Sequence, residues 1–247
     1  METELRPLWS RLFRFNWVFG LGLVLAICIP RFVLVLNANK LANYSSIGMI
    51  MLVSAIIPFV FLSKYGRHRI GIRKPTNYRW LAYSFVTGIL ISTVLFALGY
   101  ALYADTFSNW YVYIGQSYNI AEDLSAQDKL VYFFVYAVSG MTFSPIGEEL
   151  FFRGIVHASF AKNVGESNAS VIDSLAFALT HLAHFGIVYI SGAWQFLPIP
   201  AVLWVLGMFI TSIAFFKCKQ QTGSILGAIV SHAGFNLAMI YFIFYRL

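Results

Sequence analysis

The sequence predicts an all-α membrane protein, a polytopic bundle of about seven or eight transmembrane helices around a buried polar cavity. Of its 247 residues, 59% are hydrophobic and only 11% are charged, whereas about a quarter of the residues in a soluble domain are charged. The mean hydropathy is +0.73. Apolar stretches of about 20 residues, the length that crosses a bilayer, recur along the chain. No polar stretch is long enough to form a separate soluble domain.

Seven apolar segments are candidate membrane spans, and one further helix is expected among them. The first segment follows Arg11 and Arg14 as a signal peptide would. It is too long for one, and no cleavage site follows cleanly, so we expect a retained span. The expected spans lie near residues 15–36, 45–63, 80–103, 130–146, 170–190, 197–216 and 224–245, and the further helix near 147–162.

The distribution of charge predicts which side of the membrane each loop faces. The net charge is +7, and in a membrane protein this excess indicates positive-inside topology rather than nucleic-acid binding. Most basic groups of the loops fall on one expected side of the membrane: Arg6, Arg11, Arg14, those from Lys64 to Arg79, Lys217 and Lys219. The loop 104–128, on the other side, carries Asp105, Glu122, Asp123 and Asp128. We therefore expect a cytoplasmic N-terminus, with Arg31 and Lys40 as a minority on the outer side. Binding of anionic lipid or of substrate is the alternative use of the basic loop from Lys64 to Arg79.

Two acids and a base occur together at the end of the fourth span. Glu148, Glu149 and Arg153 lie in otherwise apolar sequence, and an ionised side chain near the bilayer centre costs roughly 2.5–3.5 kcal/mol. Glu149 and Arg153 are four residues apart and can pair on one helix face, whereas Glu148 points about 100° away. We expect Glu148 to face a wet cavity as a general base, braced by Glu149 and Arg153. The alternative is a solvated salt bridge on an interfacial helix.

Histidines occur in two later spans. His181 lies four residues after Phe177, whose ring can fix the imidazole and exclude water, and His184 is a rival three residues further on. His232 and Asn236 are also four residues apart, so both can point into one space. For each of these positions taken alone, the alternative is a hydrogen bond between helices.

The orientation of the spans predicts that the three polar positions meet. With a cytoplasmic N-terminus, Glu148 lies toward the cytoplasmic end of its span, His181 about half-way along the next, and His232 about two turns into the last. All three then fall at similar depth, between the membrane centre and the cytoplasmic face. Small residues in the last span permit close helix approach; they are Ser224, Gly227, Ala228, Ser231 and Gly234.

Together these residues suit hydrolysis of an amide bond inside the membrane. A glutamate and a histidine can activate water, and a second histidine with an amide can donate hydrogen bonds to the oxyanion of a tetrahedral intermediate. Glu148, His181 and His232 are also a ligand set for zinc, which leaves a metal-activated water open as the alternative.

Other protease chemistries lack their residues in this chain. It contains no HExxH motif, no GxSxG elbow and no aspartate pair in its spans, which disfavours zincin, serine and aspartyl mechanisms. Asp173 stands alone near a helix start, where we expect it to cap the helix. Cys28 and Cys218 are isolated and have no spacing typical of a disulfide framework or a metal site.

In these residues the chain resembles the CPBP family of intramembrane proteases, also called the Abi or type II CAAX prenyl protease family. The family pattern is EExxxR, FxxxH and HxxxN on successive membrane helices. This chain has, in the same order, Glu148-Glu149 with Arg153, Phe177 with His181, and His232 with Asn236. The resemblance covers roughly residues 130–245. It divides the chain into N-terminal spans without a recognised motif, 1–129, and an expected catalytic core, 130–247.

The resemblance implies a role for each motif residue. Glu148 activates water with the help of His181, while His232 and Asn236 form the oxyanion site. The residues implied to support them are Glu149, Arg153 and Phe177. Members of the family are described both as metalloproteases and as glutamate proteases that act without bound metal. We favour the second description, in which no cofactor is required.

The main hypothesis is therefore a multi-pass endopeptidase of a bacterial cell membrane that hydrolyses a peptide bond at or within the cytoplasmic leaflet. Family relatives cleave prenylated CAAX tails or act in peptide processing and bacteriocin self-immunity. The expected partners are membrane lipid and a peptide or protein substrate, with or without an attached lipid, in an oligomeric state that the sequence leaves open. One alternative is a non-catalytic scaffold or immunity protein that keeps the fold. Another is a proton-coupled transporter, although no internal repeat supports it.

Overall fold

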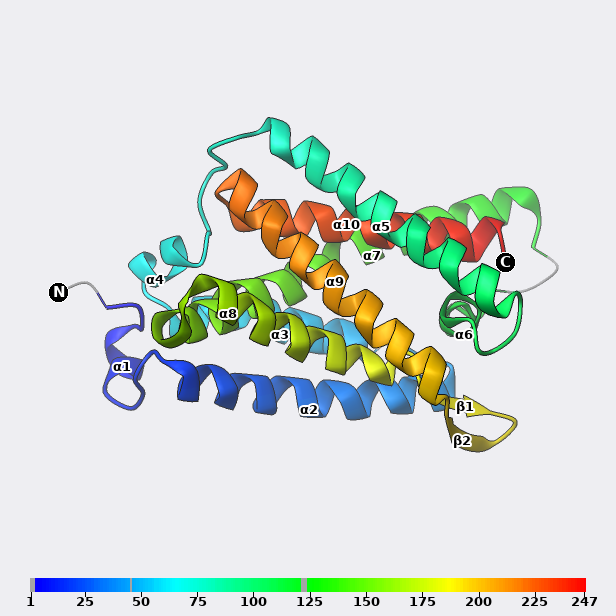
Figure 1. Ribbon diagram of the computed structural model, residues 1–247, viewed down its shortest axis with the longest axis horizontal. Coiled ribbons are helices and arrows are strands. Elements are labelled where there is room, and N and C mark those ends of the chain that lie inside the picture. Colours follow the sequence, from blue (N-terminus) through cyan, green and yellow to red (C-terminus); the bar gives the residue numbers. More distant parts are fainter. Residues whose placement is uncertain (1–2, 45, 121–123) are drawn as a thin grey trace.

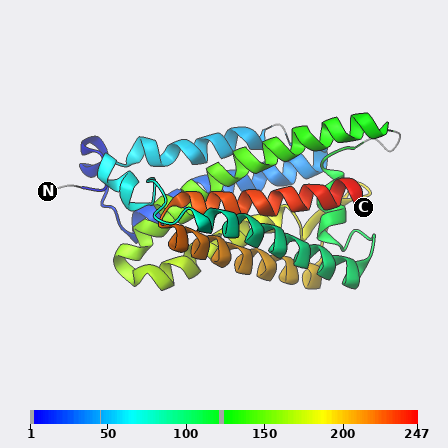
Figure 2. The same ribbon diagram turned by 90° about the horizontal axis from the view of Figure 1, so that it is seen from above.

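Long helices that run roughly along one axis make up most of the structure (Figures 1 and 2). It is a computed structural model that describes residues 3–44, 46–120 and 124–247. Glu122 and Asp123, two of the acids expected in an outer loop, lie outside the described residues. Within the described residues the predicted all-α bundle is confirmed, with the addition of one small hairpin.

The expected spans correspond to helices in the described residues. The long helices are α2 (Trp17–Leu41), α3 (Ile47–Phe61), α5 (Arg79–Tyr103), α7 (Ala126–Glu149), α8 (His157–Thr180), α9 (Pro198–Thr222) and α10 (Ile225–Tyr245); the short ones are α1 (Pro7–Ser10), α4 (Lys64–Arg69) and α6 (Trp110–Gln116). Five helical stretches are long and apolar enough to cross a membrane, one of them the 58-residue run Ala126–Ala183. The chain is therefore a multi-pass membrane protein.

The helix expected near 147–162 is a continuation of α7. The chain passes from α7 through a π-helical segment, Leu150–Val156, into α8. It reverses direction at Gly165, whose φ of +80° interrupts the helical path (Figure 1). A residue with a side chain rarely adopts this conformation, so the glycine permits the reversal. π-helical turns are rare and frequently mark functional sites. This one begins directly after Glu149 and leads into the first half of α8.

The expectation of a span over 170–190 is wrong at its C-terminal end. Helix α8 ends at Thr180, a short 3₁₀ turn covers His181–Ala183, and an antiparallel hairpin follows, with β1 (Ile187–Ile190) and β2 (Ala193–Phe196). Ser191 and Gly192 connect the strands with φ values of 51° and 81°. Two central residues with positive φ favour a tight hairpin. His181 therefore lies at the end of a helix rather than half-way along a span.

The charged segments separate to the two ends of the bundle. Helices α1 and α4 and the C-terminal end of α9 lie at one end, and the hairpin, α6 and the C-terminus at the other (Figure 1). The basic groups expected in the cytoplasm belong to the first set. Lys40 belongs to the second, since its Nζ lies 5.9 Å from the ring of Tyr189 in β1.

Close backbone contact joins α10, the last of these helices, to α5. A Cβ added to Gly88 of α5 would lie 1.8 Å from the carbonyl oxygen of Ser231, and one added to Gly234 of α10 would lie 2.3 Å from that of Phe85. Glycines permit this approach because membrane helices associate through tight van der Waals packing. The small residues of the last span thus allow the close packing predicted from the sequence, and this packing fixes the position of α10.

A bulkier residue at this crossing should destabilise the bundle. Gly88→Val forces α5 and α10 apart, and overpacking of this kind costs about 1–3 kcal/mol. Gly22→Val in α2 is the matched control, because a Cβ at Gly22 meets nothing within 4 Å. We expect equilibrium unfolding in mixed micelles to show a lower free energy of unfolding for the first variant only. Equal stability of the two variants would contradict the close crossing.

Candidate active site

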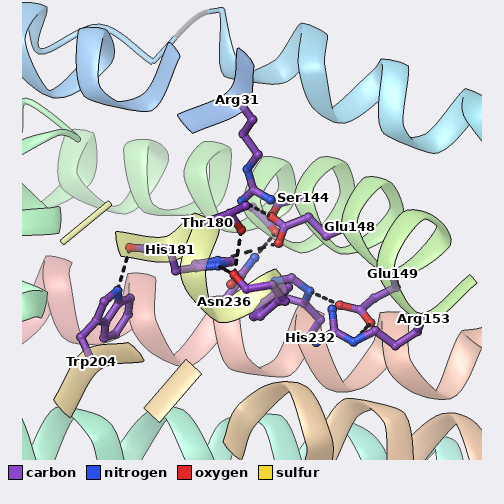
Figure 3. Close-up of polar contacts among 12 residues, drawn as sticks. Arg31, Ser144, Glu148, Glu149, Arg153, Thr180, His181, Trp204, His232 and Asn236 are labelled. Atoms are coloured by element: carbon purple, nitrogen blue, oxygen red, sulfur yellow. Dashed lines mark hydrogen bonds and ion pairs between the residues drawn. The ribbon is translucent and has the colours of Figure 1, made fainter. Parts of the chain in front are cut away.

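A cavity of about 340 Å³ lies inside the helix bundle. This volume is within the usual range of ligand pockets, about 300–1,000 Å³. Its lining comes from most of the long helices and is mainly apolar. The polar groups that converge on it include Arg31, Glu148, His181, His184, His232 and Asn236. The structure thus brings the three polar positions of the sequence to one cavity, together with an arginine from α2 (Figure 3).

Glu148 is held at the wall of this cavity by two donors that contact the same oxygen. The Nη2 of Arg31 donates to Oε1 at 2.9 Å, and the Oγ of Ser144 donates to Oε1 at 2.5 Å. The glutamate is only 2% exposed. Its other oxygen, Oε2, has no hydrogen bond among the described residues. Glu148 therefore presents one free carboxylate oxygen beside the cavity.

His181 faces that free oxygen. Its Nδ1 lies 2.7 Å from the backbone carbonyl of Phe177, and its Nε2 lies 3.8 Å from Oε2 of Glu148. A carbonyl can only accept, so the ring carries its proton on Nδ1 and leaves Nε2 as an acceptor. The Phe177 ring packs against the imidazole at 4.2 Å between centroids, and Trp204 donates to the His181 carbonyl. The ring contact orients the imidazole, and the Trp204 hydrogen bond holds the backbone of His181.

Glu149 contacts His232 rather than Glu148. Its Oε1 lies 2.7 Å from Nδ1 of His232, and its Oε2 lies 3.2 Å from Nε of Arg153. The predicted pairing of Glu149 with Arg153 is therefore confirmed, while the expectation that the pair braces Glu148 is wrong. The reason is geometric: α10 approaches the face of the helix that carries Glu149, and α2 approaches the face that carries Glu148.

Aromatic rings surround the charge of Arg153. Its guanidinium carbon lies 4.1 Å from the ring centroid of Phe177 and 5.6 Å from that of Phe215. The Phe215 ring also stacks on His232 at 4.9 Å. The arginine is fully buried, and cation–π contacts stabilise a desolvated guanidinium. One arginine thus connects the aromatic wall of α8 and α9 to the Glu149–His232 pair.

Asn236 and His184 complete the polar lining. One N–H of the Asn236 amide donates to the backbone carbonyl of Gly140 at 2.8 Å. The amide carries a second N–H, and the residue borders the cavity. His184 stacks beside His181, with 5.3 Å between ring centroids. Like His181, it borders the cavity.

Among the described residues, no three His, Cys, Asp or Glu side chains are placed to hold a metal ion. Arg31 occupies Oε1 of Glu148, and Glu149 occupies Nδ1 of His232. Cys28 and Cys218 are buried and unbridged.

Asp173 has a different environment from the one expected. It does not cap a helix; its Oδ2 lies 2.6 Å from Nδ1 of His157, and Nε2 of His157 lies 2.8 Å from Glu166. His157 precedes the reversal at Gly165 and Asp173 follows it, so the pair ties the two halves of α8 together. Because both residues are almost fully buried, this polar contact is an internal one.

Sequence reasoning missed Arg31 and Ser144. Arg31 was expected on the outer side of the membrane, which is wrong, because it lies buried in the interior against Glu148. The same cost of an ionised group within a span that singles out Glu148 also applies to Arg31. That signal was available, although nothing in the sequence shows which carboxylate of the later helices Arg31 meets.

Comparison with protein-family models gives one match. Residues 130–238 match the model described as Type II CAAX prenyl endopeptidase Rce1-like. The matched region includes every motif residue from Glu148 to Asn236 and confirms the resemblance seen in the sequence. Comparison with curated proteins and with solved structures gives no match.

Removal of Asp173 should destabilise the protein more than removal of a helix cap. Asp173→Ala leaves His157 without its buried partner, and breaking a buried pair costs about 3–5 kcal/mol, against about 1 kcal/mol for a lost cap. Glu166→Ala is the control, since Glu166 contacts the same ring but its side chain is 69% exposed, and exposed pairs contribute about 0–1 kcal/mol. Equilibrium unfolding in mixed micelles measures both. Similar losses for the two variants would contradict the internal role of Asp173.

Proposed function

On the basis of the match of residues 130–238 to this endopeptidase family, we propose that the protein is an intramembrane endopeptidase of the glutamate type. The observation that carries the proposal is the free Oε2 of Glu148 opposite the unprotonated Nε2 of His181, 3.8 Å away at the edge of the cavity. Two acceptors at this separation can hold one water molecule between them.

The geometry supports a water molecule that donates one hydrogen bond to Glu148 and the other to His181. A hydrogen-bonded water lies about 2.8 Å from each acceptor, and two acceptors 3.8 Å apart can both be reached from one such position. The water then donates one proton to Oε2 of Glu148 and the other to Nε2 of His181. Its lone pairs face the cavity. When Glu148 takes the first proton, the oxygen attacks the carbonyl carbon of the substrate.

We propose that His232 and Asn236, which both border the cavity, donate hydrogen bonds to the developing oxyanion. Asn236 has one N–H beyond the one given to Gly140. His232 donates its Nδ1–H to Glu149, and it can donate from Nε2 as well when the ring carries both protons. A carboxylate hydrogen-bonded to the other nitrogen stabilises that imidazolium, as in catalytic triads. Glu149 and Arg153 then act on the reaction through His232.

The same residues argue for water activation by carboxylate rather than by metal. A zinc site needs about three protein donors that converge on one point, and among the described residues no three His, Cys, Asp or Glu side chains are placed in this way. We therefore propose that Glu148, with His181, is sufficient to activate water and that no cofactor takes part.

The surroundings of the cavity support a substrate that reaches it from the membrane. Apart from the site residues, the lining is largely apolar, with Met51, Phe143 and Met239 among its members. Such a lining suits an apolar peptide segment or an attached lipid. The substrate that we propose is a membrane-associated peptide or protein, with a prenylated tail as one candidate, cleaved near the cytoplasmic leaflet of a bacterial membrane.

Loss of Glu148 should abolish cleavage without preventing membrane insertion. Proteomics of peptide termini in cells that carry the wild-type protein or Glu148→Gln should show termini that occur with the wild type only. We expect His181→Ala and His232→Ala to lose the same termini. General-base catalysis contributes about 10²–10⁴-fold, so residual cleavage by Glu148→Gln should be at least about 100-fold lower.

The control for this experiment is Glu166→Gln, which removes an acid from the surface of the same helical run outside the cavity. This variant should keep the wild-type set of termini. Wild-type termini with Glu148→Gln would refute the proposed chemistry. A cellular phenotype that survives all three site substitutions would instead indicate a scaffold.

A further inference from the structure

Arg31 reaches the proposed active site from outside the region that matches the family. It lies on α2, about 100 residues before the first matched residue, and it is 3% exposed. Figure 3 shows its side chain extending from α2 onto the carboxylate of Glu148. Among the described residues that line the cavity, no other Lys or Arg occurs. The charge of Glu148 is therefore balanced by a residue that no motif includes.

The contacts of Arg31 make the two oxygens of Glu148 different. Oε1 accepts from Arg31 at 2.9 Å and from Ser144 at 2.5 Å. Oε2 has no hydrogen bond among the described residues and faces His181. The carboxylate is thus held by one oxygen, and its rotation is fixed so that the other points at the position of the proposed water.

The charge of Arg31 has a second consequence for Glu148. A carboxylate removed from water stays ionised only if a cation or several donors replace its hydration. A guanidinium remains protonated at all physiological pH values, so Arg31 provides this compensation regardless of the state of nearby histidines. A neutral carboxylic acid would have no capacity to take a proton from water.

We propose that Arg31 is a positioning residue for the hydrolytic reaction: it binds Oε1 of Glu148, keeps the carboxylate ionised, and directs Oε2 at the water. The proposal rests on the proposed function and extends it to the N-terminal spans. In the reaction, an O–H bond of water breaks and its proton goes to Oε2. The oxygen bonds to the carbonyl carbon, whose π electrons move to the carbonyl oxygen. Collapse of this intermediate breaks the C–N bond, and Glu148 returns the proton to the leaving nitrogen.

One consequence concerns the division of the chain. Residues 130–247 were expected to form the catalytic core, with 1–129 as N-terminal spans without a recognised motif. If Arg31 positions the base, α2 belongs to the catalytic machinery, and the region that matches the family is incomplete without it.

The test is a pH–rate profile of the purified full-length protein in micelles. The probe is a quenched fluorescent peptide that ends in a farnesylated CAAX tail, or a peptide that spans a cleavage site found by terminal proteomics. Arg31→Gln should lower the rate at neutral pH by at least about 10-fold, because Glu148 would lose the partner that orients its carboxylate and balances its charge. The acidic limb of its profile should move to higher pH by about one unit or more, since an adjacent opposite charge shifts titration by about this amount.

Two further variants separate the charge of Arg31 from its hydrogen bond. Arg31→Lys keeps the charge and should restore part of the rate with an acidic limb close to that of the wild type. Ser144→Ala removes the other donor to Oε1 without changing charge, so it should lower the rate and move the limb less than Arg31→Gln does. Lys40→Gln is the matched control, an exposed cation on the same helix, and it should match the wild type throughout.

The outcomes distinguish this proposal from the proposed function. Arg31→Gln with the wild-type rate and profile would overturn the positioning role, and a faster variant would show instead that Arg31 masks the base. Unchanged cleavage by Glu148→Gln would refute the proposed function itself.

A thermal unfolding cycle tests the pair where no probe is cleaved. Arg31→Gln and Glu148→Gln should each lower the melting temperature, and the double variant should recover most of that loss, because no charge is then left unpaired. Additive losses in the double variant would overturn the proposed pairing.

Discussion

A carboxylate buried in an apolar helix bundle is stable only beside groups that replace its hydration, and this constraint shapes the whole cavity. Two adjacent glutamates near the end of α7 point in different directions and meet different partners. Arg31 and Ser144 compensate Glu148, whereas Arg153 and His232 compensate Glu149. Helices α2 and α10 must therefore converge on one short segment of α7 and the π-helical turn that follows it. The contacts that stabilise these two buried carboxylates are thus also the contacts that the proposed chemistry uses.

The two glutamates consequently have different relations to the cavity. Both oxygens of Glu149 lie close to charged or chargeable partners, Oε1 at 2.7 Å from His232 and Oε2 at 3.2 Å from Arg153. Only Oε1 of Glu148 has a partner that close, whereas its Oε2 lies 3.8 Å from His181 beside the cavity. The open oxygen of Glu148 suits it to react with water, and the two ion pairs of Glu149 suit it to orient a histidine. Two residues of the same type thus acquire different functions from their neighbours alone.

Much of this arrangement could be predicted from the sequence because it follows from helical periodicity and the cost of buried charge. The four-residue spacings gave the Glu149–Arg153 pair and the contact of Phe177 with His181. Long-range contacts could not be predicted in this way. The partner of Arg31 depends on which face of α7 lies against α2, and the pairing of Asp173 with His157 depends on the reversal at Gly165. The end of α8 at Thr180 was missed because apolar residues continue into the hairpin, where a Ser-Gly turn, rather than hydropathy, marks the change of structure.

The 117-residue separation of Arg31 from Glu148 also has a consequence for how the chain is made. Proteins are synthesised from the N-terminus, so α2 enters the membrane long before α7 leaves the ribosome. During that interval Arg31 is an unneutralised charge within a span, at an insertion cost of roughly 2.5–3.5 kcal/mol if it lies at the bilayer centre. The strongly apolar remainder of α2 offsets this cost. The apolar composition of α2 thus allows it to insert before Glu148 has been synthesised. The ion pair forms only after α7 has entered the membrane.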